Sequence, residues 1–199
     1  EEGATLHIEE GVKIIAVYDD IADYILVKQG GKINAVGTSD KPIVMTSEKE
    51  EPGAWGGIHI CGRAHTNAEG GKGSSEIGGA VYGGNDDADN SGMLQYIRLE
   101  YTGFAFDEEH EANGISFYGV GNGTIVDHCQ AYKGSDDGFE FFGGSVNVSN
   151  LVAVSCSDDS FDWTEGWNGK GTNLVAYQEA ESTLGYDCDC LMECDNNGS

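Results

Sequence analysis

One short pattern is written three times in this chain, as Gly114-Ile-Ser-Phe117, Gly138-Phe-Glu-Phe141 and Ser160-Phe-Asp-Trp163. Each copy places a small residue before an apolar, a polar and an aromatic residue, and a glycine-containing turn and a second apolar run follow. The copies begin at residues 114, 138 and 160, so the step is 24 and then 22 residues. Alternation with a period of two predicts β-strands. A repeat this short cannot bury its apolar face alone, so neighbouring copies must stack.

The fold that follows is all-β, a right-handed parallel β-helix (β-solenoid) with three short strands per turn and corners at Gly, Asp and Asn. Equivalent residues then lie one strand spacing apart, about 4.8 Å. We therefore expect Asp136 beside Asp158 on neighbouring turns. The recurring aromatic residues predict a stacked ladder inside the core, formed by Phe139, Phe141, Phe161 and Trp163.

The strand pattern extends towards the N-terminus and predicts one β-helical domain over residues 1–178. Residues 61–92 interrupt the period and are rich in Gly, Ser, Asn and Asp, which indicates a long excursion loop. A second, shorter acidic loop spans residues 107–113. Residues 179–199 leave the pattern and form a cysteine-rich acidic tail or cap.

The net charge is −25, from 35 acidic and 10 basic residues. This balance excludes nucleic acid as a partner, because binding phosphate needs Lys and Arg. The chain has no apolar run of about 18 residues, so we expect no insertion into a membrane. Divalent cations, cationic surfaces or plain solubility are the explanations that remain for so acidic a chain.

Acidic pairs recur at one corner of the repeat, in Ser135-Asp-Asp-Gly138 and Ser157-Asp-Asp-Ser160. Two carboxylates one strand spacing apart repel by about 3.5 kcal/mol at an effective dielectric near 20. A calcium ion would relieve that repulsion and prefers such oxygen ligands. A solvated row of aspartates and a catalytic role are the alternatives. The candidate calcium ligands here are Asp136, Asp137, Asp158, Asp159 and Asp162, with Glu140 on the adjacent strand.

A second candidate calcium site lies in the excursion loop. The run Asp87-x-Asp89-x-Ser91-Gly92 has oxygen ligands at alternate positions and a glycine for the bend, as in the first half of a calcium loop. Position twelve of such a loop would be Arg98, so this is no EF-hand. The alternative is a turn whose side chains hold their own backbone. The candidate ligands are Asp86, Asp87, Asp89 and Asn90.

Six cysteines, an even number, favour an oxidising compartment. Cys61, Cys129 and Cys156 lie in or beside expected strands, whereas Cys188, Cys190 and Cys194 crowd the tail. We expect disulfides that pin the tail to the coil or to itself, with the pairing open. A thiolate metal site in the tail and buried free thiols are the alternatives.

Several segments resemble a recurring sequence of secreted right-handed β-helix proteins of bacterial cell surfaces, many of them lipoproteins. They are Leu26 to Val44, Trp55-Gly-Gly-Ile58, Tyr82 to Asp87, Asp136 to Gly144 and Asp158 to Asp162. The resemblance implies the β-helix fold and a secreted or surface location. It implies no particular activity.

We therefore expect a secreted or surface-displayed structural or adhesion module that binds calcium, associates with itself or with other surface proteins, and is not a catalyst. A polysaccharide-active hydrolase or lyase is the alternative, because polygalacturonases are β-helical and also carry adjacent Asp pairs. Their Asn-Thr-Asp, Gly-His-Gly and Arg-Ile-Lys elements are absent here. A third possibility is a glycan-binding module without turnover, in which Trp167 would offer an exposed ring.

Overall fold

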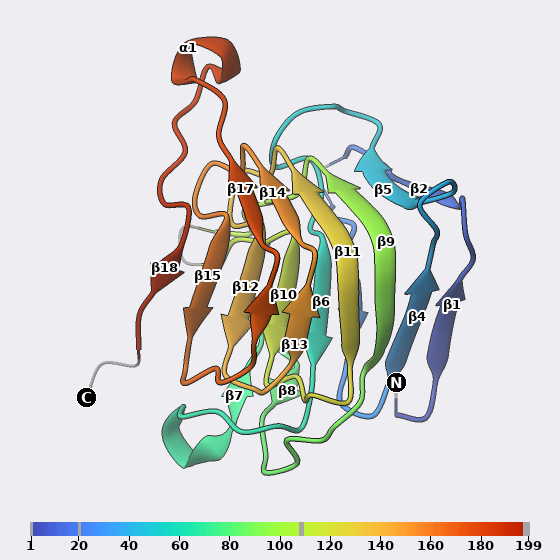
Figure 1. Cartoon of the computed structure of the whole chain (residues 1–199), viewed down its shortest axis with the longest axis vertical. Coiled ribbons are helices and arrows are strands. Elements are labelled where there is room, and N and C mark those ends of the chain that lie inside the picture. Colours follow the sequence, from blue (N-terminus) through green and yellow to red (C-terminus); the bar gives the residue numbers. More distant parts are fainter. Residues whose placement is uncertain (1, 20, 108–109, 197–199) are drawn as a thin grey trace.

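The chain forms a right-handed parallel β-helix in the computed structural model, which describes residues 2–19, 21–107 and 110–196. In Figure 1 the strands of the front sheet run upwards and those of the rear sheet run downwards. The coil advances from the blue N-terminal side at the right to the red C-terminal side at the left, which makes it right-handed. The expected fold is confirmed.

Two parallel sheets carry the coil. The rear sheet has six strands in the order β18 (Glu193–Cys194), β15 (Phe161–Thr164), β12 (Phe139–Phe142), β10 (Ile115–Tyr118), β6 (Ile58–Cys61) and β3 (Ile25–Val27). The front sheet has ten strands. Six follow one path, β1 (Thr5–Ile8), β4 (Lys32–Val36), β9 (Gly92–Glu100), β11 (Ile125–Tyr132), β13 (Asn147–Ser149) and β16 (Gly171–Thr172). The others are β2 (Lys13–Ala16), β5 (Ile43–Ser47), β14 (Val152–Val154) and β17 (Val175–Tyr177).

Three strands make one turn of the coil, as β12, β13 and β14 show. In the preceding turn the long strand β11 takes the place of the last two and bends at His128, where φ is 53°. The same left-handed bend recurs at Asn150 and Asn173. Asn tolerates this backbone conformation better than most residues. The Asn173 side-chain amide donates to Oδ1 of Asn150 at 3.0 Å, so the corners stack along the coil.

Inward-facing aromatic residues stack as the repeat predicts. Phe139 pairs in register with Phe161, and their rings lie 5.5 Å apart and nearly parallel. Trp163 is level with Phe141 in the strand register, but the ring that stacks on Phe141 belongs to Trp167, at 4.6 Å. Trp167 is half-buried and packs against the core, so the expectation of an exposed ring is wrong, and sugar stacking on it stays a prediction.

The excursion loop leaves the coil after β6 and returns at β9. It contains a short 3₁₀ turn (Glu69–Gly71) and an antiparallel hairpin of β7 (Gly73–Ser74) and β8 (Val81–Tyr82). The hairpin covers part of the outer face of the rear sheet, where Tyr82, Tyr118 and Phe142 form a second apolar cluster. The excursion loop therefore forms one border of the part of this outer face that the hairpin leaves uncovered.

The tail leaves β17, passes through α1 (Glu181–Leu184) and returns as β18, which pairs with β15. It therefore continues the rear sheet by one short strand. Among the described residues no helix has the length and apolar character needed to cross a membrane.

The expected disulfides are not formed, because all six cysteines are free thiols. Cys61, Cys129 and Cys156 are buried at separate places in the fold. The Cys129 thiol lies within hydrogen-bonding reach of the Leu94 carbonyl, 3.6 Å away, instead of facing another sulfur. Burial raises the pKa of Cys129 and of Cys156 to about 12, so both remain protonated. In the tail, Cys188 and Cys190 are half-buried and Cys194 is exposed.

A candidate cation site in an acidic cleft

Carboxylates line a cleft of about 220 Å³ beside the turns that precede the rear strands. Eight acidic side chains line it, Glu76, Glu111, Asp136, Asp137, Glu140, Asp158, Asp162 and Glu193, and none of these described lining residues is basic. Such a concentration of one charge is a strong electrostatic attractor for cations.

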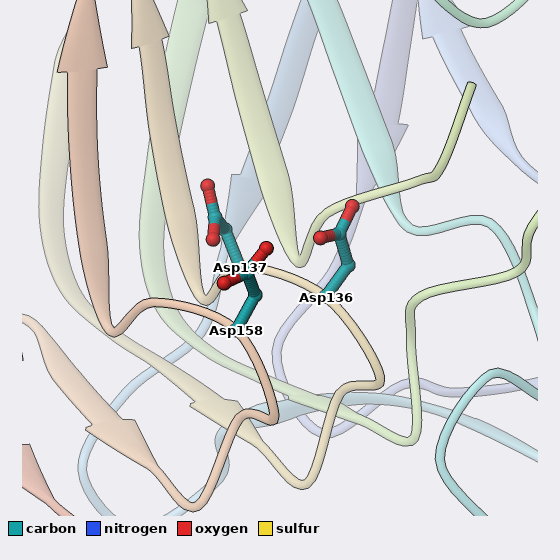
Figure 2. A group of neighbouring side chains, drawn as sticks. All are labelled: Asp136, Asp137 and Asp158. Atoms are coloured by element: carbon teal, nitrogen blue, oxygen red, sulfur yellow. The ribbon is translucent and has the colours of Figure 1, made fainter. Parts of the chain in front are cut away.

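The stacked Ser-Asp-Asp turns bring the first group of ligands together. Because β12 and β15 pair in register, the turns before them lie side by side. Asp136, Asp137 and Asp158 each offer a carboxylate oxygen, and these oxygens lie within 4.8 Å of one another. Figure 2 shows the three side chains projecting from two neighbouring turns into the same space. The predicted proximity of Asp136 and Asp158 is confirmed.

Backbone contacts fix these turns. The Asp159 amide donates to Oδ1 of Asp137 at 2.9 Å, and the Gly138 amide donates to the Asp159 carbonyl at 2.8 Å. A Cβ at Gly138 would lie 2.7 Å from the Ser160 carbonyl oxygen, closer than real Cβ contacts. Glycine is therefore required where one turn lies directly against the next, and the aspartates are held on a tightly packed backbone.

A row of polar side chains continues from the turns along the outer face of the rear sheet. The register aligns Ser116 with Glu140, Glu140 with Asp162, and Asp162 with Glu193. Two further carboxylate groups result, each with oxygens within 4.8 Å of one another. They are Asp137–Glu140–Asp162 and Asp159–Asp162–Glu193. All five residues predicted at this corner thus belong to one continuous acidic cleft or its edge.

The cleft raises the pKa of its carboxyl groups. Burial, followed by the charges of Glu111 and Asp158, raises the pKa of Asp136 to about 7. Burial and the charge of Asp136 raise the pKa of Asp137 to about 9. The pKa of Glu140 is raised well above its ordinary value, again chiefly by burial. Without a cation, several of these groups keep a proton at neutral pH.

One oxygen in the cleft has no partner. Oδ1 of Asp162 is buried and finds no hydrogen-bond donor among the described residues, and the residue is only 8% exposed. An unsatisfied buried carboxylate oxygen is costly, and a bound cation would satisfy it. The donor set is oxygen alone, without imidazole or thiolate, which suits calcium, magnesium or manganese better than zinc or copper.

The second predicted site lies elsewhere. Asp86, Asp87, Asp89 and Asn90 sit beside residues that follow the end of β6, whereas the Ser-Asp-Asp turns precede the start of β12 and β15. Their side-chain oxygens accept backbone amides, for example Oδ2 of Asp89 from Arg63 at 3.0 Å. Oδ1 of Asp87 also faces Nδ1 of His65 at 2.7 Å. Within the segment, Oδ1 of Asp86 accepts the Ala88 amide at 3.2 Å and Oδ1 of Asn90 accepts the Gly92 amide at 2.9 Å, as in the alternative of a turn that holds its own backbone. Calcium binding there stays a prediction.

Three lining residues come from segments outside the repeat. Glu76 belongs to the excursion loop, Glu111 to the short acidic loop and Glu193 to the tail. The repeat of 22 to 24 residues does not extend to these segments, so it predicts no position for them. Tertiary packing of the excursion loop and tail brings them to the cleft.

Comparison with known proteins bears on the fold. The family model described as "Pectate-lyase like beta helix domain" matches residues 1–199. No curated protein and no solved structure is significantly similar to the chain.

Proposed function

This chain belongs to the family of pectate-lyase-like β-helix domains, and on that premise we propose that it is a structural or adhesion module that binds calcium. The observation that carries the proposal is the group of carboxylate oxygens from Asp136, Asp137 and Asp158 within 4.8 Å of one another. They belong to a cleft lined by acidic side chains only.

Calcium fits the cleft better than magnesium does. Calcium takes six to eight oxygens in flexible geometry, whereas magnesium demands a nearly ideal octahedron and keeps several waters. Asp136, Asp137 and Asp158 would hold the ion, with Glu76 and Glu140 nearby. The ion would supply the positive charge that these residues lack. The chain itself holds the carboxylates through the stacked turns, so little rearrangement accompanies binding.

We expect calcium to stabilise the folded protein strongly at pH 7.5. Free calcium at about 100 times its dissociation constant adds about 2.7 kcal/mol. For a chain of this size, that raises the melting temperature by about 5–10 °C. Differential scanning calorimetry with calcium, with magnesium and with excess chelator measures the shift, and chelator should reverse it. A melting temperature that changes neither with calcium nor with chelator would refute the proposed function.

A secreted or cell-surface location follows from the same proposal. Extracellular calcium modules work with dissociation constants of about 10⁻⁴–10⁻³ M, a range open to a site of this kind. We also propose self-association through the two ends of the coil, where β1 and β2 at one end and β16 and β17 at the other leave strand edges unpaired. The partner would be a second copy, joined head to tail with parallel strands. Light scattering with and without chelator would detect such assemblies.

Polysaccharide cleavage is the second candidate function. Family membership favours it, and so does the Asp136 carboxyl, whose pKa of about 7 suits a proton donor at neutral pH. Against it, the described lining residues offer no Lys or Arg to meet a uronate carboxylate. Incubation with neutral and acidic glycans decides the matter. Release of reducing ends or unsaturated products, lost in Asp136→Asn, would replace the structural role by an enzymatic one.

A further inference from the structure

The C-terminal tail docks on the acidic turns through backbone contacts. The Asp189 amide donates to the Asp158 carbonyl at 3.2 Å, and the Cys190 amide donates to Oδ1 of Asp159 at 2.7 Å. In return, the Ser160 amide donates to the Cys190 carbonyl at 3.0 Å. Strand β18 then pairs with β15 over two positions. The tail is therefore laid directly on the edge of the cation cleft.

The tail begins with an ion pair of Glu179 with Lys133 at 3.1 Å, but where it meets the acidic turns neither apolar burial nor opposite charge explains the docking. Leu191 is 50% exposed and Met192 is 51% exposed, so the apolar side chains nearest the turns stay half in solvent. Residues 171–196 contain no Lys or Arg. The tail's acidic residues therefore approach the acidic turns with no basic side chain from the tail between them. Carboxylates brought this close repel one another, so a counter-charge would stabilise the short acidic strand against the acidic turns at neutral pH.

The contact between tail and turn contains a ready-made set of oxygens. Asp159, Asp162 and Glu193 each offer a carboxylate oxygen, and the three lie within 4.8 Å of one another. Asp159 is 2% exposed and Asp162 is 8% exposed, and Oδ1 of Asp162 has no hydrogen-bond partner among the described residues. Glu193 comes from the tail and lies beside Asp162 in the strand register. The set thus joins the coil and the tail.

We propose that a second divalent cation binds between Asp159, Asp162 and Glu193 and fastens the tail to the last turn of the coil. The inference rests on the proposed function, because an ion of the same kind, calcium, would occupy each of the two sites. Asp162 also belongs to the group with Asp137 and Glu140, and Asp137 is a ligand of the first site, so that group lies between the two sites. The tail is then a cap that closes the rear sheet when the cation is present and is released when the cation is removed.

Release of the tail would uncover an apolar end of the coil. Met192 helps to line a cleft of about 250 Å³ at this end, together with Trp163, Trp167 and Leu174. Trp163 also pairs in register with Cys194 of β18. By holding the tail in place, the cation would therefore control whether this apolar cleft and the edge of strand β15 are exposed to solvent.

The test uses the full chain at pH 7.5 with calcium as the probe. Native mass spectrometry counts the bound ions, and hydrogen exchange reports on the backbone amides of residues 186–194. We expect two calcium ions on the unaltered protein, and at least a tenfold slowing of exchange in the tail relative to chelator. Glu193→Gln should bind a single ion and exchange quickly with or without calcium. Glu193 is exposed, so this change should leave the fold intact. Glu181→Gln, an equally exposed change within the same tail, should behave like the unaltered protein.

The outcomes separate the two proposals. Two ions and calcium-dependent protection retained in Glu193→Gln would overturn the second site. One ion on the unaltered protein, with a tail indifferent to calcium, would also overturn the second site while leaving the first. No bound ion at all would overturn both. Asp136→Asn, which lies outside the second group, should lose one ion and keep the calcium-dependent protection of the tail.

Discussion

Replacing Asp137 by asparagine should remove the stabilisation that calcium gives at the site of Asp136, Asp137 and Asp158 and, in chelator at pH 8, make the protein more stable than the unaltered one. Asp137 is 6% exposed, and burial together with the charge of Asp136 raises its pKa to about 9. A carboxyl whose pKa is higher in the folded state contributes stability at low pH. That contribution is lost as the pH rises from about 4, the unfolded value, towards the folded value. Asparagine cannot ionise, so it escapes the loss.

The substitution should preserve the turn. Oδ1 of Asp137 accepts the Asp159 amide at 2.9 Å, and the amide oxygen of asparagine can accept the same bond. Melting curves at pH 5 and pH 8, each with chelator and with calcium, give the comparison. The unaltered protein in chelator should melt at a lower temperature at pH 8 than at pH 5, and Asp137→Asn should show a smaller decrease. The rise of about 5–10 °C that one calcium ion gives at the first site should disappear in the variant, and the rise that remains should be the one due to the ion at the tail.

Asp40→Asn is the matched control, because Asp40 is an exposed aspartate outside the cleft. It should keep both the pH dependence and the calcium response of the unaltered protein. If Asp137→Asn were less stable than the unaltered protein in chelator at pH 8, the carboxylate would be stabilising without a metal. Electrostatic strain in the cleft would then be disproved.

Phe139→Ala should cost about 3–5 kcal/mol of unfolding free energy, the range for removing a large buried aromatic side chain. Phe139 is fully buried, between Ile115 and Phe161 in the strand register. Its ring stacks on that of Phe161 at 5.5 Å, so the alanine would leave a gap across neighbouring turns. Urea unfolding followed by circular dichroism measures the loss.

Tyr177→Ala serves as the comparison, since Tyr177 is an aromatic residue on a strand of the same coil but is 58% exposed. Its cost should stay below about 1 kcal/mol, as for other surface changes. Phe139→Leu should lie between the two, because it keeps part of the buried volume. Equal costs for Phe139→Ala and Tyr177→Ala would mean that the stacked aromatic residues do not form the stabilising core.

The sequence predicted those parts of the molecule that the repeat controls. A step of 22 to 24 residues with alternating side chains places Phe139 on Phe161 and Asp136 near Asp158, because stacking of turns leaves no other register. Once the coil is known, the register of each repeated residue follows, although the ring that stacks on Phe141 is that of Trp167 and not that of Trp163. The acidic corner was therefore predictable to the residue.

Segments outside the repeat were not predictable in this way. Glu76 and Glu193 reach the cleft through the packing of the excursion loop and the tail, and no period relates them to the turns. Trp167 lies in a glycine-rich turn, which suggested exposure, but it is half-buried over Phe141 at the end of the coil. The cysteine count suggested disulfides, whereas all six thiols are free, three of them buried at separate places in the fold and three in the tail.

Anomalous diffraction from crystals grown or soaked with manganese, a calcium substitute that scatters anomalously, tests the account most directly. The cation cleft predicts a peak surrounded by the carboxylates of Asp136, Asp137 and Asp158, at metal–oxygen distances of about 2.1–2.5 Å. Calcium in excess should displace it. A crystal soaked in saturating manganese that shows no peak in the cleft, or that binds manganese only at surface carboxylates elsewhere, would contradict the central claim.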